Sequence, residues 1–411
     1  MPIRFSRVSE TAALPQASLG HQARSFPDLP GPAAAALRLA ELSTAPCAFA
    51  PVAVDRPLAL YGAGNMGLLA RDFLKTAGQE VALVIDRNAG RAGVGAWSAT
   101  PPVTPEAVPD AIKRAVSVAV CVVTAAYEPI ERALHEAGFA DVVPFYDLAE
   151  SFRHLHPLSN GWFAPPMSAD EQVETAAALA GWGDDASRAH HLQFLAWRRL
   201  RQEWVFTPAL PLSGDSRYFI PEILAVLRAD EVFIDGGAYD GCVTADFARR
   251  MNGAFSRIVA IEPDRPNRLR LQATVRDMLN SDMRITVHDF ALAERNGEAP
   301  FHEGLGYASQ LAATGTTRAT CCALDSLDLA PTYIKLHLEG GELAALKGAQ
   351  RTLLTHRPLV AATVYHNADG LFKTARWLMQ TLPDYEFLFR IHSWCGTGAV
   401  IYGIPNERRK Q

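Results

Sequence analysis

An acidic residue and two glycines lie where an apolar segment ends in the second half of the chain. The segment Glu231–Gly241 (EVFIDGGAYDG) predicts a strand, then a loop with Gly237 and Gly241, then the start of a helix. Asp235 ends this strand, where a dinucleotide-binding loop would begin with glycine. A carboxylate at this place disfavours a pyrophosphate and suits a cationic group such as an α-ammonium.

The next two predicted strands also end in acidic residues. Glu262 ends the strand Ile258–Glu262, where a carboxylate can accept hydrogen bonds from ribose hydroxyls. Asp289 ends the strand Ile285–Asp289, where a polar side chain can reach the edge of an adenine. Partners for an ammonium, a ribose and an adenine at successive strand ends predict a site for S-adenosylmethionine. The alternative is a nucleotide-binding fold that has lost its ligand.

The fourth and fifth predicted strands lead into residues that could move a proton. His337 and Glu339 follow the strand Tyr333–Leu336, and His366 follows the strand Leu359–Tyr365. The carboxyl ends of parallel strands line the ligand site in α/β sheets, so these three side chains are candidate catalytic residues. A histidine with a pKa near neutrality can act as a general base towards a hydroxyl group. The alternative for each histidine is a structural role.

Other polar residues of this region have open roles. His392, at the end of a predicted strand, is either a base or a loop residue, and Lys335 could pair with a carboxylate. Tyr307 and Ser309 belong to a loop of small residues that could cover an acceptor. Histidines and acids are otherwise scattered, so no metal site is predicted. The three candidate catalytic residues could nevertheless surround an ion in the folded chain.

A second glycine motif lies in the first half of the chain. Gly62, Gly64 and Gly67 fit the pattern GxGxxG between a predicted strand and a predicted helix, and Asp86 ends the following strand. This context is typical of a dinucleotide site, with NAD or a nucleotide-sugar as the ligand. The alternative is an accessory domain that keeps the tight turn for packing and binds nothing. The region lacks a second half for a nicotinamide, which favours an accessory or substrate-presenting role.

Strands and helices alternate over two stretches of the chain, which predicts two α/β domains with parallel sheets. The last two predicted strands, Tyr385–Arg390 and Gly398–Ile404, flank a glycine turn and predict an antiparallel hairpin. Ser168 and Glu171 match a capping box before a helix. The expected parts are a loosely attached arm at 1–56, a Rossmann-like domain at 57–150, a helical connector at 151–214 and a larger α/β domain at 215–411.

The C-terminal half resembles the FkbM family of S-adenosylmethionine-dependent methyltransferases. The resemblance implies a class I methyltransferase fold, with a Rossmann-like seven-stranded sheet. It also implies S-adenosylmethionine as the methyl donor and O-methylation of a hydroxyl on a sugar or similar small molecule or glycan. The stretches that carry it are Glu231–Gly241, Ile258–Asp264, Tyr333–Gly348, Val364–His366 and Leu382–Ser393.

The sequence departs from the family pattern at one strand end. The family typically has aspartate where this chain has His337, in Ile334-Lys-Leu-His337-Leu-Glu339-Gly340. That strand end faces the methyl group in the implied fold. His337 therefore either serves as the base or marks altered or lost chemistry. Two competing interpretations stay open, an NAD-linked sugar oxidoreductase that uses the N-terminal domain and a non-catalytic nucleotide-sensing protein.

Composition narrows the classes of partner. The chain has 39 Lys and Arg residues against 44 Asp and Glu residues, a net charge of −5 that does not indicate a nucleic acid or an anionic membrane. The longest nearly apolar run, Ala115–Ala126, has about half of the ~20 residues that a spanning helix needs. Six scattered cysteines without a CxxC pair indicate no disulfide framework, so a cytoplasmic location is expected. A homodimer is expected on general grounds.

Overall fold

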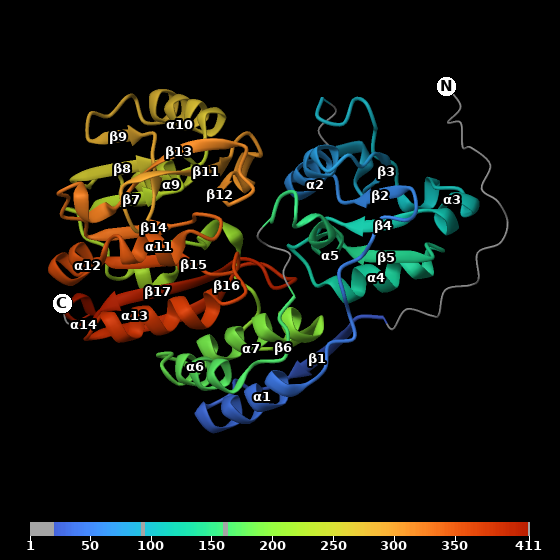
Figure 1. Cartoon of the computed structure of the whole chain (residues 1–411), viewed down its shortest axis with the longest axis horizontal. Coiled ribbons are helices and arrows are strands. Elements are labelled where there is room, and N and C mark those ends of the chain that lie inside the picture. The colour runs from blue at the N-terminus through green and yellow to red at the C-terminus, as the bar shows by residue number, and fades with distance from the viewer. Residues whose placement is uncertain (1–19, 92–94, 159–162, 410–411) are drawn as a thin grey trace.

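Two mainly parallel sheets lie side by side in the computed structural model, which describes residues 20–91, 95–158 and 163–409 (Figure 1). The larger sheet has the strand order β16-β17-β15-β14-β7-β8-β9, and β17 runs antiparallel to both of its neighbours. The predicted seven-stranded α/β sheet with a terminal antiparallel hairpin is therefore confirmed. Its strands are β7 (Val232–Gly236), β8 (Arg257–Ile261), β9 (Ile285–His288), β14 (Tyr333–Leu336), β15 (Leu359–Thr363), β16 (Tyr385–Ile391) and β17 (Ala399–Pro405).

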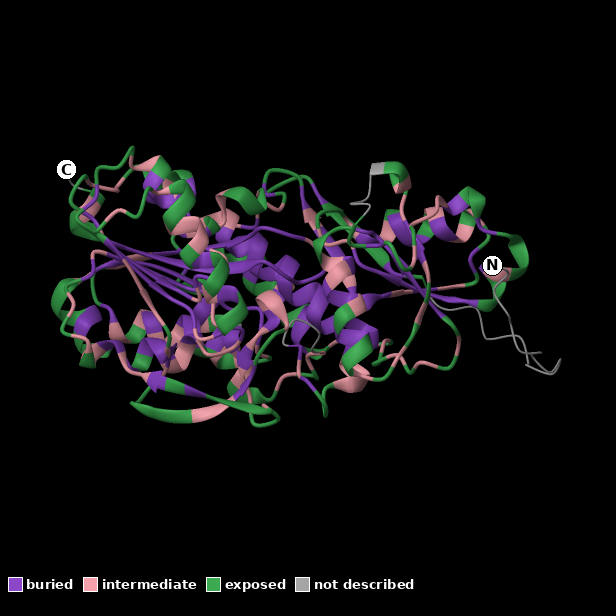
Figure 2. Cartoon of the chain, turned by 90° about the horizontal axis from the view of Figure 1, so that it is seen from above, coloured by how far each residue is buried: buried purple, intermediate pink, exposed green. Residues whose placement is uncertain are grey.

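Helices enclose the strands of this sheet. Figure 2 shows the strands as a buried layer with helices above and below it. The central strands β14 and β15 are buried along their whole length, because most of their residues are apolar and the polar Lys335 and Thr363 have internal hydrogen-bond partners. The helices of this part are α8 (Pro221–Leu224), α9 (Cys242–Arg250), α10 (Arg265–Met278), α11 (Glu342–Lys347), α12 (Gln350–His356), α13 (Ala375–Thr381) and α14 (Asn406–Arg409).

The smaller parallel sheet has the order β3-β2-β4-β5 and lies to the right in Figure 1. All three of its strand pairs are parallel, as the alternation of strands and helices predicts. Its strands are β2 (Leu58–Tyr61), β3 (Val81–Ile85), β4 (Ser117–Val120) and β5 (Asp141–Pro144). Its helices are α2 (Asn65–Thr76), α3 (Asp110–Ala115), α4 (Tyr127–Glu136) and α5 (Phe145–Ala149).

A third, four-stranded sheet was not expected from the sequence. It has the order β10-β13-β11-β12, with strands β10 (Ala291–Leu292), β11 (Gly297–His302), β12 (Gln310–Leu311) and β13 (Thr317–Cys322). Two of these strands have two residues each, too few to show a period in the sequence. The turn between β11 and β12 contains the small-residue loop with Tyr307 and Ser309.

The expected loose arm is wrong for the part that the structure describes. Strand β1 (Gln22–Phe26) pairs in parallel with β6 (Gln202–Phe206), and helix α1 (Pro32–Thr44) buries Leu39 and Leu42. The helix packs on α7 (Asp185–Leu200), and its apolar side chains share a core with the seven-stranded sheet. The physical reason is the spacing of these leucines, which gives α1 an apolar stripe that needs a partner. Residues 1–19 of the expected arm lie outside the described residues.

The segment expected as a helical connector also contributes to this core. Helix α6 (Ala169–Ala180) begins with the predicted capping box, in which the Ser168 hydroxyl accepts from the Glu171 amide and the Glu171 carboxylate accepts from the Ser168 amide. Helix α7 ends at Leu200, because Arg201 takes a left-handed conformation. Trp204 consequently lies in β6, where it is buried in the same core as Phe194 of α7.

Several contacts join the parts that carry the two parallel sheets, and two of them are made by loops near the strand ends. The amide of Trp394, in the turn of the terminal hairpin, donates to the carbonyl of Val123 after β4 over 2.7 Å. Tyr307 and Ala308 pack against the core of the four-stranded parallel sheet. The edges where both sheets end are therefore held facing each other.

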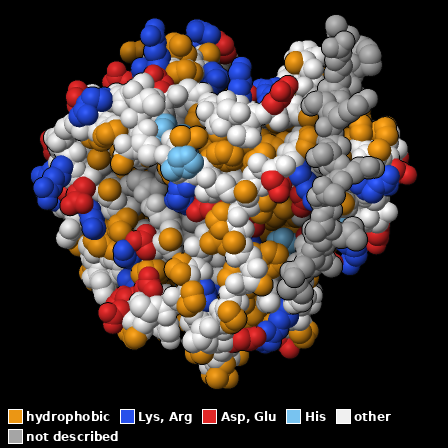
Figure 3. All heavy atoms as spheres, turned by 45° about the vertical axis from the view of Figure 1, so that its right-hand side comes forward, with side chains coloured by type: hydrophobic (Ala, Val, Ile, Leu, Met, Phe, Trp, Pro, Cys, Tyr) orange, Lys and Arg blue, Asp and Glu red, His pale blue; other side chains and the backbone are white. Residues whose placement is uncertain are grey.

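Figure 3 shows acidic and basic side chains interspersed over the face in view. Among the helices in the described parts of the chain, none is long and apolar enough to cross a membrane.

The docking of α1 gives a stability prediction. Leu42→Ala should lower the free energy of unfolding by about 2–5 kcal/mol, because it opens a cavity under a fully buried side chain. Leu37→Ala on the same helix is the control, since Leu37 is 76% exposed, and it should change stability by less than about 0.5 kcal/mol. Urea unfolding followed by circular dichroism measures both values. Equal effects of the two substitutions would mean that α1 is not packed on the core.

Candidate active site

A cavity of about 1040 Å³ lies between the carboxyl ends of the two parallel sheets. Both glycine motifs open onto it, one through Gly62 and Gly64 and the other through Gly237. Glu262, His337 and other polar groups also line it. The two regions that the sequence singled out separately thus share one space.

Asp235 does not line this cavity, contrary to the predicted contact with an ammonium group. Its carboxylate is fully buried and accepts hydrogen bonds from Lys335 Nζ at 2.8 Å and from Thr244 Oγ1 at 2.7 Å. Lys335 also donates to the carbonyl oxygen of Gly237 over 2.7 Å. The negative charge of Asp235 is therefore paired with Lys335 inside the protein, beneath the glycine loop. This is the carboxylate pairing considered for Lys335.

The glycine loop after β7 brings the chain close to the end of β14. Gly237 has φ +70°, and a Cβ at this position would overlap the carbonyl oxygen of His337. Only glycine combines this conformation with this close approach. Gly241 precedes α9 and packs against α10 without lining the cavity. Gly237 is therefore the glycine of this loop that lines the cavity.

Glu262 lies at the cavity wall after β8, as predicted. Its two carboxylate oxygens accept hydrogen bonds from the amides of Tyr239 at 2.8 Å and Asp264 at 2.9 Å. Burial raises the pKa of Glu262 to about 7, although these amides act in the opposite direction. Each oxygen has one further lone pair with which it could accept from a ligand hydroxyl.

Asp289 is exposed and does not line the cavity, so the predicted contact with an adenine is not supported. Strand β9 ends one residue earlier than predicted, at His288. Asp289 therefore lies just beyond the strand, in an exposed position.

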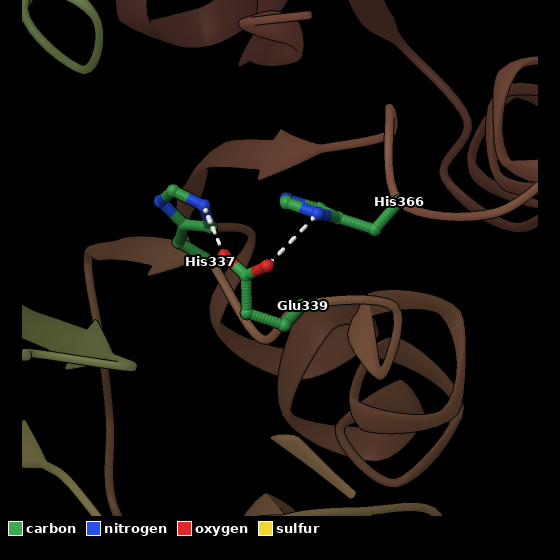
Figure 4. Close-up of side chains that lie close together, drawn as sticks. All are labelled: His337, Glu339 and His366. Atoms are coloured by element: carbon green, nitrogen blue, oxygen red, sulfur yellow. Dashed lines mark ion pairs between the residues drawn. The ribbon is translucent and has the colours of Figure 1, made fainter. Parts of the chain in front are cut away.

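The three candidate catalytic residues form one cluster at the ends of β14 and β15. Figure 4 shows both imidazoles directed at the carboxylate of Glu339. His337 Nε2 lies 3.0 Å from one carboxylate oxygen, and His366 Nδ1 lies 3.2 Å from the other. Glu339 has φ +50°, an uncommon conformation for a residue other than glycine, and it places the carboxylate between the two rings. Strain of this kind often marks a functional position.

The charges in the cluster are set by burial and by mutual contact. Burial lowers the pKa of His337 to about 4, despite the opposing hydrogen bond with Glu339. Burial disfavours the charged form of Glu339, but His366 and His337 outweigh it and lower the pKa of that carboxyl group. At neutral pH the cluster therefore holds an anionic Glu339 beside a neutral His337.

Two tyrosines that the sequence did not single out hold His337 in place. The Tyr218 hydroxyl lies 2.7 Å from His337 Nδ1, and the Tyr365 hydroxyl lies 3.1 Å from Nε2. Tyr365 precedes His366 in the sequence, so its place near the cluster could have been predicted. Tyr218 lies in a segment without periodicity before β7, so only the folded structure reveals its role.

The cluster also has the residue types of a metal site. The side-chain atoms of His337, Glu339 and His366 that could bind an ion lie within 4.8 Å of one another, and two imidazoles with a carboxylate suit a transition-metal ion.

The remaining candidates have structural contacts. His392 is buried between the Ser213 carbonyl oxygen at 3.0 Å and the Tyr402 hydroxyl at 2.7 Å, which supports its interpretation as a structural residue. Ser309 donates to Asp264 over 2.7 Å and fixes the loop, and Tyr307 of that loop lines the cavity.

The glycine motif after β2 has the geometry of a tight strand-to-helix turn. A Cβ at Gly67 would overlap the carbonyl oxygen of Gly62, so this glycine serves packing, whereas Gly64 has open space before it. Asp86 accepts hydrogen bonds from the amides of Ala63 at 2.8 Å and Asn88 at 2.7 Å. Gly62, Gly64 and Asp86 line the cavity, and Gly67 does not.

Comparison with known proteins bears on the C-terminal part. Residues 235–389 match a family model described as the methyltransferase FkbM domain. The crystal structure of methyltransferase FkbM from Methylobacillus flagellatus KT has a similar fold, with 20% identity, a TM-score of 0.58, and coverage of 90% of this chain and 98% of that chain. Precorrin-6y C5,15-methyltransferase from Geobacter metallireducens GS-15 aligns with 18% identity and a TM-score of 0.30, over 47% of this chain and 92% of that chain.

A search among curated proteins gave no match. The family match runs from the last two residues of β7 through most of β16, and it includes Glu262 and the whole cluster of His337, Glu339 and His366. The resemblance inferred from the sequence is thereby confirmed for this part of the chain. Residues 235–389 form a methyltransferase domain of the FkbM family.

Proposed function

We propose that the protein transfers the methyl group of S-adenosylmethionine to a hydroxyl group of a small molecule bound in the cavity. One observation carries the proposal: Glu262, His337 and Glu339 line the same cavity at the carboxyl ends of β8 and β14, the two strands that flank β7 in the sheet. In an open α/β sheet this edge is where ligands bind.

The donor half of the proposed site lies over β7 and β8. Gly237 lets the backbone approach a ligand closely, and Glu262 offers carboxylate oxygens to ribose hydroxyls. S-adenosylmethionine supplies a sulfonium methyl group that is already activated for transfer. The loop after β14 contacts the loop after β7, so a donor held there has its reactive end near His337.

His337 is the proposed general base. It is neutral at pH 7 with Nε2–H directed at Glu339, so Nδ1 is its basic nitrogen. Nδ1 takes the hydroxyl proton through the Tyr218 hydroxyl bonded to it, while the acceptor oxygen forms its bond to the methyl carbon and the bond between that carbon and the donor sulfur breaks. Glu339 stabilises the resulting imidazolium through its carboxylate at 3.0 Å. Tyr218 and Tyr365 keep the ring in one orientation, and His366 orients Glu339 from the other side. After the transfer, the positive charge that the donor sulfur carried is on His337, which faces the anionic carboxylate of Glu339.

The N-terminal glycine loop is the proposed second wall for the acceptor. Gly62, Gly64 and Asp86 face the cavity opposite the methyltransferase domain. This position supports a substrate-presenting role, with a nucleotide-linked sugar as one acceptor that such a loop could hold. The hydroxyl to be methylated would then point towards His337.

The donor site gives a binding prediction. Glu262→Ala should weaken S-adenosylmethionine binding by about 1–3 kcal/mol, because ribose hydroxyls lose their acceptor. Asp289→Ala is the matched control and should leave the affinity unchanged, since Asp289 lies outside the cavity. Isothermal titration calorimetry with the purified protein measures both. Unchanged affinity in Glu262→Ala would remove this residue from the donor site.

The base gives a prediction for pH dependence. His337 is active when unprotonated, and its pKa in the folded protein lies below the ordinary value, so activity should persist below about pH 6 and fall only near pH 4. His337→Asn should lose about 100-fold in turnover while keeping donor affinity, because asparagine cannot take the proton. His288→Asn is the control, a partly buried histidine outside the cavity.

Initial rates at each pH need a parallel record of folding. Burial of a neutral histidine makes stability fall as pH drops below the ordinary histidine pKa, because the unfolded chain binds the proton first. Circular dichroism at each pH separates this loss from the loss of the base. Full turnover in His337→Asn would contradict the assignment and leave Glu339 or His366 as the base.

A further inference from the structure

We propose that the guanidinium of Arg217 binds a carboxylate or phosphate group of the acceptor, so that the protein methylates hydroxyl compounds that carry a negative charge. This inference rests on the proposed function and names the class of acceptor. Arg217 lies just before α8, lines the cavity and is half-buried. It was not singled out in the sequence, where no motif surrounds it.

Arg217 has no acidic partner in the described parts of the chain. No carboxylate oxygen there lies within 4.0 Å of its side chain, whereas the nearby Arg250 binds Asp246 at 2.6 Å. Its Nη1 makes one long hydrogen bond of 3.5 Å to the Tyr365 hydroxyl. Its Nε is shielded from solvent and has no hydrogen-bond partner among the described residues. A guanidinium removed from water in this way is costly unless an anion joins it.

The tyrosines around Arg217 cannot supply that anion. Burial raises the pKa of Tyr218, Tyr365 and Tyr402, so their hydroxyls stay neutral at physiological pH. They offer hydrogen bonds but no charge. A ligand carboxylate or phosphate matches the fork of the guanidinium and can accept two hydrogen bonds from it.

The position of Arg217 in the cavity indicates that the anionic group it binds belongs to the acceptor and not to the methyl donor. The Tyr402 hydroxyl of β17 donates to the Arg217 carbonyl oxygen. The side chain of Arg217 reaches the hydroxyl of Tyr365, which follows β15. Both strands lie on one side of β14, while Glu262 follows β8 on the other side. His337, at the end of β14, lies between the donor ribose site and Arg217. A molecule held by Arg217 therefore approaches the base from the side opposite the ribose.

Paired acceptors test this assignment. The full-length protein is given labelled S-adenosylmethionine with glucose, glucose 6-phosphate or glucuronic acid, and transfer of the label is measured. A charged compound should have a kcat/KM about 10- to 100-fold above that of glucose. Arg217→Gln should remove this advantage, Arg217→Lys should keep part of it, and Arg276→Gln should keep all of it. Arg276 is a matched control because its side chain is 65% exposed, pairs with Asp277 and does not line the cavity.

Equal use of glucose and its charged forms, or an equal loss for all acceptors in Arg217→Gln, would overturn the proposal. If no compound of the panel is methylated, inorganic phosphate is titrated by calorimetry into protein saturated with S-adenosylhomocysteine. This titration measures whether anion binding in the cavity depends on Arg217. Binding that Arg217→Gln weakens at least about tenfold supports the proposal, and binding independent of Arg217 overturns it.

Donor binding separates the remaining outcomes. Loss of S-adenosylmethionine affinity in Arg217→Gln would assign the anion to the donor's own carboxylate and overturn the acceptor assignment. Failure of the unmodified protein to bind S-adenosylmethionine would instead contradict the proposed function. In that case phosphate binding that depends on Arg217 would still identify an anion site in the cavity.

Discussion

The ion pair between Lys335 and Asp235 supports the whole floor of the cavity. It joins β14 to β7 inside the sheet, and Lys335 also holds the carbonyl oxygens of Gly236 and Gly237 at 3.1 and 2.7 Å. The Tyr218 ring lies 5.1 Å from the ammonium, and its hydroxyl fixes His337. Breaking a buried pair of this kind typically costs about 3–5 kcal/mol. The loop that approaches the donor and the histidine proposed as base thus depend on one internal contact.

The donor side and the N-terminal part are connected through a short chain of contacts. Glu262 accepts from the amide of Asp264, and Asp264 holds the loop after β11 through Ser309. Tyr307 of the same loop packs on the core of the four-stranded parallel sheet. The wall that faces the donor ribose is therefore anchored on the domain that faces the acceptor. This arrangement explains why one cavity, and not two separate sites, lies between the sheets.

Much of the fold could be predicted because apolar runs with clear ends specify buried strands. Strand β14 has the predicted bounds, and β2 and β3 lie next to the glycine motif and before Asp86 as predicted, since each strand is short, mainly apolar and bounded by polar residues or glycine. Strand β1 could not be predicted, because four of its five residues are exposed and mainly polar. The third sheet was missed for a similar reason, as its strands are short and stabilised by pairing more than by burial.

The site was predicted less completely than the fold. Glu262, His337 and Glu339 reach the cavity because strand ends determine their place. The role of Asp235 could not be decided from its position, since a carboxylate there can face a ligand or a buried lysine. Arg217 and Tyr218 lie in an irregular segment, so their approach to His337 depends on packing between distant parts of the chain. Residues that act through such contacts leave no period or spacing in the sequence.

The division of the cavity wall has a consequence for how this enzyme could diversify. The proposed base, its supporting carboxylate and the donor contacts all come from the C-terminal part, whereas the opposite wall comes from the loops after β2, β3 and β4. Changes in those loops alter which molecules fit without touching the groups that carry out the transfer. Recombination of N-terminal parts between relatives would therefore exchange the part of acceptor preference that these loops determine, and leave the anion contact proposed for Arg217 and the reaction chemistry unchanged.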